Sequence, residues 1–163
     1  MSKDEIVFHR IGTVHSPYQD LDGMPIQPAA GEGIRGSVEV DPAYQEGLKD
    51  LEAFSHIILV YYLHEAKAPN LLVKPFLDDI HHGVFATRAP RRPNGIGISV
   101  LRLLSIEKNI LEVQNVDILD GTPVLDIKPY VPDFDVQEEV RIGWLEKQRG
   151  KIKGKRSDDR FIK

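Results

Sequence analysis

IGISVLRLLSIEKNILEVQNV, residues 96–116, decides the fold class, because it holds two apolar runs separated by three polar residues. The break is Glu107-Lys108-Asn109, and asparagine is common in tight turns because it tolerates left-handed backbone. Residues 111–114, LEVQ, alternate between apolar and polar side chains, which is the period of a half-exposed strand. The stretch therefore predicts an antiparallel hairpin with strands at 96–106 and 110–116.

The strongest single strand signal is FSHIILVYYLH, residues 54–64. Its nearly continuous apolarity predicts burial on both faces, and His64 and Glu65 would then emerge at the rim of a sheet. Many short strands punctuated by glycine and proline, with no internal repeat, predict a mainly β fold, either a barrel or a sandwich. The other elements expected are strands at 6–14, 34–40, 84–87 and 124–127, a short helix capped by Asp41, and a helix at 140–148.

Composition limits the class of protein. At 163 residues and 41% hydrophobic content, the chain is long enough for one domain with a real core, which we assign to residues 1–140. No apolar stretch is long enough to span a membrane, and the first residues lack a signal-peptide core. The absence of cysteine excludes disulfides and thiolate chemistry and is compatible with a cytoplasmic protein. With a net charge of −4, an RNA partner would need a local basic patch.

Such a patch is present in GVFATRAPRRPNGIGIS, residues 83–99. It contains Arg88, Arg91 and Arg92 within five residues, on backbone that Pro90 and Pro93 stiffen. No acidic residue occurs from 80 to 106. Guanidinium groups suit phosphate and carboxylate, so this uncompensated cluster predicts an anion-binding loop. A solvated, positively charged surface loop is the alternative.

Three polar side chains near the carboxyl end of the β region form a candidate catalytic group. If residues 124–130 are extended, Asp126, Lys128 and Tyr130 lie on one face. An acid, an amine and a phenol side by side could orient a substrate and remove a proton. The alternative is a surface ion pair with Tyr130 packed beneath it.

Residues 147–156 hold six basic residues and follow the predicted helix. We expect residues 141–163 to form a C-terminal helix and basic tail, either a solvated end or a source of phosphate contacts to RNA.

The chain has no GxxxxGK[ST] motif, and Gly95-Ile96-Gly97 does not follow a strand, so a dinucleotide fold is not expected. His81-His82 has no accompanying ligand spacing, so we expect no metal site.

Three blocks together resemble the TsaA-like family, whose best known member type is TrmO. They are IGTVHSPY at 11–18, the arginine block at 83–99, and DILDGTPVLDIKPYVP at 117–132; residues 54–64 are a weaker fourth. The resemblance implies a single-sheeted, mostly antiparallel β-barrel with short helices and long loops. It also implies a homodimer that binds S-adenosylmethionine near its interface and methylates N6 of N6-threonylcarbamoyladenosine beside the anticodon of tRNA.

For the reaction that the resemblance implies, N6 must lose a proton. Asp126 is our candidate general base, with Lys128 and Tyr130 orienting the substrate. One departure from the family pattern is Gly95, where the family typically has proline. Glycine frees a loop position that proline would stiffen.

Two other classes of protein remain open: an S-adenosylmethionine-dependent enzyme acting on a small molecule, and a noncatalytic RNA-binding barrel. The resemblance implies that the cofactor contacts are Gln27, Pro28, His64, Glu65, Arg88, Ile98, Asp117, Ile118, Leu119, Asp120 and Gly121. From the arginine block itself we expect substrate or RNA contacts at Arg91, Arg92 and Asn94.

Overall fold

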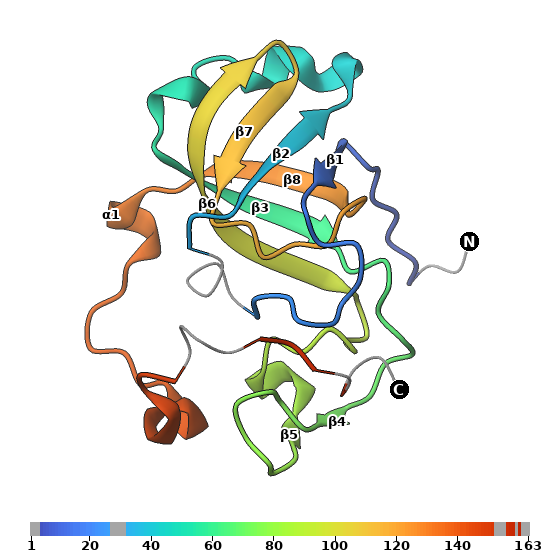
Figure 1. Ribbon diagram of the computed structural model, residues 1–163, viewed down its shortest axis with the longest axis vertical. Coiled ribbons are helices and arrows are strands. Elements are labelled where there is room, and N and C mark those ends of the chain that lie inside the picture. The colour runs from blue at the N-terminus through green and yellow to red at the C-terminus, as the bar shows by residue number, and fades with distance from the viewer. Residues whose placement is uncertain (1–3, 27–31, 152–155, 159, 161–163) are drawn as a thin grey trace.

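The computed structural model describes residues 4–26, 32–151, 156–158 and 160, and it contains a closed antiparallel barrel of six strands (Figure 1). Around the barrel the strand order is β1-β2-β7-β6-β3-β8. The mainly β, barrel-type fold expected from the sequence is confirmed. The barrel strands are β1 (Gly12–His15), β2 (Arg35–Val40), β3 (His56–Tyr62), β6 (Ile96–Glu107), β7 (Ile110–Gln114) and β8 (Pro123–Pro129).

The hairpin predicted from residues 96–116 is present as β6 and β7. Glu107 pairs with Ile110, and Lys108 takes a φ of 55°, the left-handed backbone that a two-residue turn requires. β6 is long enough to pair with two different strands along its length. Its first half pairs with β3 and its second half with β7, with a register shift between Leu103 and Ser105. The irregularity lets one strand bend around the barrel, as bulges do.

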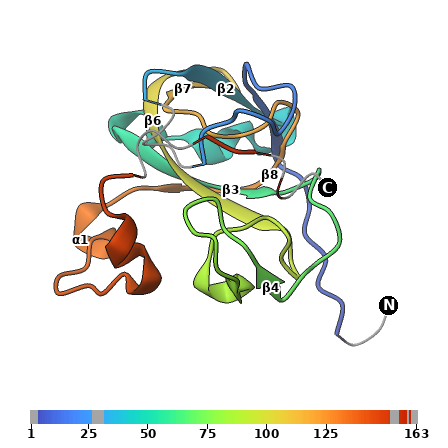
Figure 2. The same ribbon diagram turned by 60° about the horizontal axis from the view of Figure 1, so that its bottom comes forward.

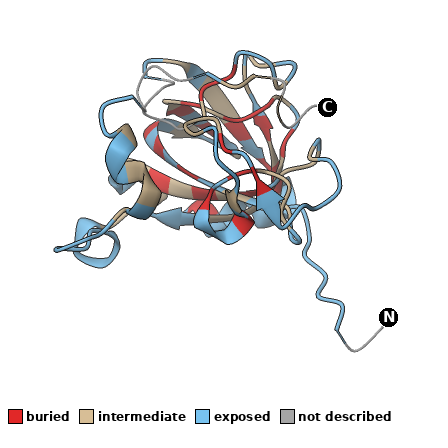
Figure 3. Ribbon diagram, turned by 90° about the horizontal axis from the view of Figure 1, so that it is seen from below, coloured by how far each residue is buried: buried red, intermediate tan, exposed pale blue. Residues whose placement is uncertain are grey.

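The core fills the inside of the barrel with branched aliphatic side chains. Ile57, Leu59, Leu101 and Leu111 are fully buried. Figure 3 shows buried stretches of ribbon alternating with exposed ones along the barrel strands. Burial on β3 alternates along the strand, so the expectation that residues 54–64 are buried on both faces was wrong. A barrel has a single interior, and its strands therefore bury one face only. The outward residues of β3 and β6 are mostly apolar, apart from His56 and Arg102, and remain partly or fully exposed.

Several predicted elements differ in extent or type. The strand expected at 6–14 begins only at Gly12, and the apolar run at 84–87 is a 3-10 helix, η4 (Val84–Ala86), rather than a strand. The helix expected at 140–148 is the 3-10 helix η5 (Gly143–Gln148). The Asp41 cap is confirmed, since its carboxylate accepts a hydrogen bond from the Ala43 amide at the start of η2 (Pro42–Leu48). The remaining elements are η3 (Leu51–Ala53), β4 (Leu72–Val73), β5 (His82–Gly83) and α1 (Pro132–Asp135).

Long loops gather at one end of the barrel. β4 and β5 form a separate two-stranded sheet there, next to η4, and the C-terminal segment runs beside them (Figures 1 and 2). The C-terminal segment is tied to the first loop, because Pro25 and Arg156 form an isolated antiparallel bridge. No helix in the described residues is long and apolar enough to cross a membrane.

Candidate functional site

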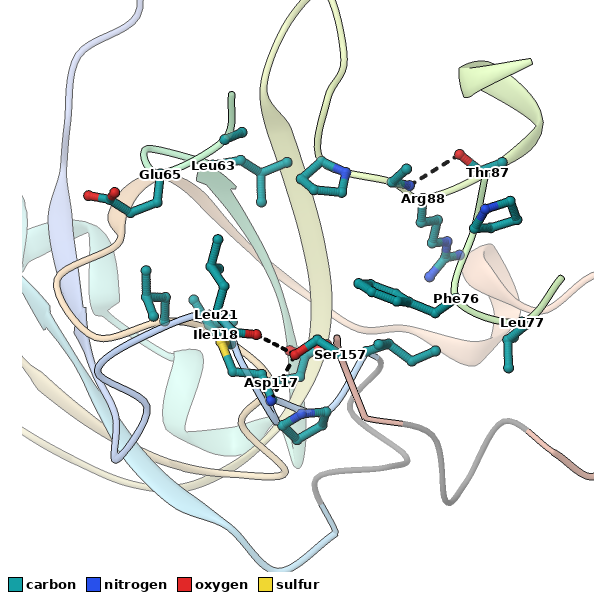
Figure 4. A pocket seen from close by; sticks show the side chains of 18 of the residues that line it. Leu21, Leu63, Glu65, Phe76, Leu77, Thr87, Arg88, Asp117, Ile118 and Ser157 are labelled. Atoms are coloured by element: carbon teal, nitrogen blue, oxygen red, sulfur yellow. Dashed lines mark hydrogen bonds between the residues drawn. The ribbon is translucent and has the colours of Figure 1, made fainter. Parts of the chain in front are cut away.

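A cavity of about 740 Å³ lies between this end of the barrel and the loops that cover it. Figure 4 shows Phe76, Thr87 and Arg88 on one side of it, and Leu21, Ile118 and Ser157 on the other. Most of the lining is apolar, and few charged side chains reach it. The cavity is therefore suited to a small organic molecule that carries a few polar groups. The charged residues among its lining are Glu65, Arg88, Asp117 and Asp158, beside His64.

A chain of hydrogen bonds leads from the barrel interior to the cavity. The Tyr61 hydroxyl lies 3.0 Å from Ser99 Oγ, and Ser99 Oγ donates to Asp117 Oδ1 over 2.7 Å. Gly97 makes this arrangement possible, because a Cβ at that position would overlap the Tyr61 ring. Ser99 therefore holds the Asp117 carboxylate at the cavity wall, and Tyr61 in turn holds Ser99. Both Ser99 and Tyr61 are buried.

The surroundings of Asp117 change its proton affinity. Burial raises the pKa of the Asp117 carboxyl to about 7, against the opposing effects of the Ser99 hydrogen bond and the Arg88 guanidinium. Burial, together with the nearby Asp117 charge, also raises the pKa of the Tyr61 hydroxyl. Asp117 therefore changes charge near neutral pH, while Tyr61 remains a hydrogen-bond donor.

The arginine block is held mainly by backbone carbonyls. Arg92 Nη1 donates to the carbonyl oxygens of Val84, Thr87 and Ala89 over 3.1, 2.8 and 3.4 Å. Arg91 Nε donates to the Ala68 carbonyl over 3.0 Å. These carbonyl oxygens satisfy guanidinium hydrogen bonds without neutralising the positive charge, so the loop keeps the positive charge expected from the sequence. The loop is thereby rigid, and Arg88 reaches into the cavity (Figure 4).

The turn at 117–121 divides into two parts. Asp117, Ile118 and Leu119 line the cavity, and their contact with a cofactor stays a prediction. Asp120 instead accepts a hydrogen bond from the Ser16 amide over 2.9 Å, and Gly121 takes a φ of 77°. These last two residues shape the turn and are not among the lining residues.

The remaining predicted cofactor residues fall into three places. His64 and Glu65 line the cavity, with His64 Nε2 3.8 Å from the Glu65 carboxylate. Ile98 lines a smaller space of about 190 Å³ that shares Tyr61, Arg88 and Asp117 with the main cavity. Gln27 and Pro28 lie outside the described residues.

Asp126 and Lys128 lie on the outer face of the barrel and are not among the residues that line either cavity. Lys128 Nζ is 2.8 Å from Asp126 Oδ2, and this contact raises the pKa of the lysine. Tyr130 packs edge-on against His56, with ring centroids 6.3 Å apart. The ion pair given as the alternative reading is present, and the catalytic role stays a prediction. Of the predicted RNA contacts, Arg92 alone borders the smaller space.

The sequence analysis missed the contribution of the C-terminal segment. Trp144 and Ser157 line the cavity, far in sequence from the rest of it. Trp144 Nε1 donates to the Ala86 carbonyl over 2.8 Å, and its ring stacks on His82 at 4.6 Å. Ser157 Oγ donates to the Leu21 carbonyl. The single tryptophan in the sequence, at 144 just before the basic tail, was a signal that this segment docks onto the body.

The fold and the cavity define a small closed antiparallel barrel whose ligand site is built by loops at one end. Among the described residues, no group of three histidine, aspartate or glutamate side chains is placed to hold a metal ion. The chain belongs to the TrmO family, since residues 13–136 match the family described as the tRNA-methyltransferase O N-terminal domain. The resemblance found in the sequence is thus confirmed.

Individual relatives agree with this assignment. A probable S-adenosyl-L-methionine-binding protein of Pyrococcus abyssi is 58% identical over 157 residues, which cover 96% of this chain and 85% of the relative. Mouse tRNA (adenine(37)-N6)-methyltransferase is 34% identical over 139 residues, 81% of this chain and 32% of the mouse protein. The crystal structure of TrmO from Pseudomonas aeruginosa matches with a TM-score of 0.73 and 39% identity, covering 86% of this chain. This chain spans 62% of that crystallised chain.

Proposed function

We propose that this protein is an S-adenosylmethionine-dependent methyltransferase that modifies N6 of N6-threonylcarbamoyladenosine beside the anticodon of tRNA. The observation that carries the proposal is the mostly apolar cavity of about 740 Å³ with Arg88 and Asp117 at its wall. The size suits a nucleoside-sized ligand, and the two charges suit its polar ends. Relatives named for S-adenosylmethionine binding and for tRNA adenine methylation support the same assignment. A tRNA substrate is consistent with a cytoplasmic location.

The lining residues have the chemistry that the cofactor requires. Leu63, Ile118 and Leu119 offer apolar surface for a purine. Arg88 would pair with the carboxylate of the methionyl part, and Asp117 would accept hydrogen bonds from ribose hydroxyls or the amino group. When bound, the cofactor supplies an electrophilic methyl group on a positively charged sulfur. The loop carbonyls that hold the arginine block keep Arg88 positioned before any ligand arrives.

The residues of the chain would contribute alignment and removal of one proton. Methyl transfer to a nitrogen is an in-line displacement, so positioning of the two reactants supplies much of the rate. The acceptor N6 must also lose a proton, and we propose Asp126 as the base that removes it. Asp126 does not line the cavity of its own subunit, so it would act on the cavity of a partner subunit.

The outer barrel face supports this arrangement. Ile98 on β6 pairs with Val60 on β3, and Val60 pairs on its other side with Asp126 on β8. Val100, Ile58 and Lys128 form the next row in the same way. Ile98 is 50% exposed and Val100 37% exposed, so an apolar strip lies beside the Asp126–Lys128 pair and the smaller space next to Arg88. We propose that this face forms the homodimer interface.

The decisive assay measures the cofactor and the reaction separately. Calorimetric titration with S-adenosylmethionine is expected to give saturable binding that Arg88→Ala weakens and that Arg35→Ala, on the exposed side of β2, leaves unchanged. Methyl transfer is then measured by mass spectrometry of nucleosides from tRNA with and without the threonylcarbamoyl group. The methylated nucleoside is expected only from the tRNA that carries the threonylcarbamoyl group. Cofactor binding without methylation of either tRNA would refute the tRNA substrate.

The dimer is tested by sedimentation. Val100→Lys would place a cation at the centre of the proposed interface and is expected to give monomers. Ile110→Lys is the control, because Ile110 is similarly exposed, at 39%, but lies on β7. Loss of methylation is expected together with loss of the dimer. A fully active monomeric Val100→Lys variant would contradict the role of a partner subunit.

A further inference from the structure

Phe85 is an exposed aromatic ring at the edge of the cavity. Its side chain is 75% exposed, although it is among the residues that line the cavity. The preceding Val84 is only 1% exposed and anchors the small apolar cluster beneath the loops. Single exposed apolar side chains are common on protein surfaces, but this ring also borders a ligand cavity, where it is available to contact a bound molecule.

The backbone on both sides of Phe85 is fixed by side chains from elsewhere. The Val84 carbonyl accepts hydrogen bonds from Thr87 Oγ1 at 2.9 Å and from Arg92 Nη1 at 3.1 Å. The Ala86 carbonyl accepts from Trp144 Nε1 at 2.8 Å. The ring is therefore presented by a rigid turn and needs little ordering when a ligand binds. A preorganised contact loses less entropy on binding than a mobile one does.

The arginine that holds this turn also acts on the ring. Arg92 Cζ lies 5.8 Å from the centroid of the Phe85 ring, within the range of a cation–π interaction. Arg91 follows on the same loop, and no acidic residue occurs from 80 to 106. The surroundings of Phe85 thus combine an aromatic surface with positive charge. Unpaired nucleobases next to phosphates are bound by this combination in proteins that recognise single-stranded RNA.

We infer that Phe85 is the stacking platform for the nucleobase that receives the methyl group. The inference deepens the proposed function and rests on it, because it takes the substrate to be RNA. A base beside the anticodon lies in a loop and can be turned outward, so it is available for stacking without opening a duplex. Stacking on Phe85 would place the base at the mouth of the cavity, while Arg91 contacts the backbone of the RNA.

The test compares Phe85→Leu with Phe85→Trp and with the wild-type protein. Leucine keeps apolar volume but has no ring to stack on, and tryptophan keeps the ring. Phe134→Leu is the matched control, since Phe134 is 76% exposed on α1 and is not among the cavity residues. Binding is measured by titration of an anticodon stem–loop RNA, and of the same RNA made abasic at the acceptor position.

Phe85→Leu is expected to weaken binding of the intact RNA about 5- to 150-fold, the range for loss of one stacked base. It should leave binding of the abasic RNA, the salt dependence of binding and the affinity for S-adenosylmethionine unchanged. Phe85→Trp should retain binding, and melting temperatures should not change, because the side chain is exposed.

Three outcomes would overturn the inference. Equal losses on the intact and abasic RNAs would mean that the ring contacts another part of the RNA. A selective loss of S-adenosylmethionine binding would mean that the ring contacts the cofactor. Loss of the dimer in sedimentation would assign Phe85 to a protein interface. Each of these results is separate from failure of the proposed function, which is judged by methylation of tRNA by the wild-type protein.

Discussion

Replacement of Asp117 by asparagine is expected to change how the stability of the protein depends on pH. The Asp117 carboxyl has a pKa of about 7 in the folded protein, against 3.8 ordinarily, chiefly because of burial. The unfolded chain therefore binds fewer protons than the folded chain between these two pH values, and the free energy of unfolding falls as pH rises through this window. Full ionisation costs about 4 kcal/mol, an upper bound because water entering the cavity screens the charge.

Asparagine can still accept the Ser99 hydrogen bond but carries no charge. Near pH 4, where Asp117 is protonated when folded, the variant and the wild type should have similar stability. Above pH 7 the variant should be the more stable of the two, by up to about 4 kcal/mol. The measurement is urea denaturation at a series of pH values, followed by tryptophan fluorescence or circular dichroism.

Asp126→Asn is the control, because the Asp126 carboxylate forms a solvent-exposed ion pair with Lys128, and the hydrogen bond it accepts from the Ile127 amide can be kept by asparagine. Its stability should follow that of the wild type within about 1 kcal/mol at every pH. If the stability curves of Asp117→Asn and the wild type run parallel from pH 4 to pH 8, the carboxyl is ordinarily hydrated in the folded state. The reasoning about its buried environment would then be refuted.

Three further substitutions test the fold around the site. Gly97→Ala would force the added Cβ into the Tyr61 ring, and it is expected to lower both the melting temperature and cofactor affinity in calorimetry; unchanged values would contradict the close packing. Leu101→Ala removes a fully buried core side chain and should cost about 2–5 kcal/mol in urea denaturation; a cost below about 1 kcal/mol would mean that the barrel interior collapses around the gap. Asp41→Ala removes the cap of η2 and should cost about 1 kcal/mol in the same assay, and no change would show that water replaces the cap.

The parts of the fold that were predictable are those set by local sequence. The hairpin of β6 and β7 follows from alternation and an asparagine-containing turn, and the Asp41 cap follows from a short polar side chain before a proline. The burial of β3 was not predictable from its own residues. Whether an apolar strand buries one face or two depends on what covers the sheet, and a closed barrel covers only the inside.

The site was predictable only where the chain repeats a family pattern. Arg88 and Asp117, two of the cofactor contacts that the resemblance implies, both line the cavity, and their contact with the cofactor stays a prediction. The role of Arg92 could not be read from sequence, because its partners are backbone carbonyls and these have no sequence signature. The same holds for Ser157, whose contacts to the first loop join residues more than a hundred positions apart.

The docking of the C-terminal segment has a consequence for how the domain is divided. The family match ends at residue 136, yet Trp144, Leu145 and Ser157 form part of the cavity wall. A fragment cut where the match ends would keep every barrel strand and lose one side of its binding chamber. The barrel strands thus support the cavity, and the C-terminal segment supplies one of its walls. The C-terminal segment contacts the covering loops, at Ala86 and Leu21, so we expect sequence changes in it to alter the cavity rather than the barrel strands.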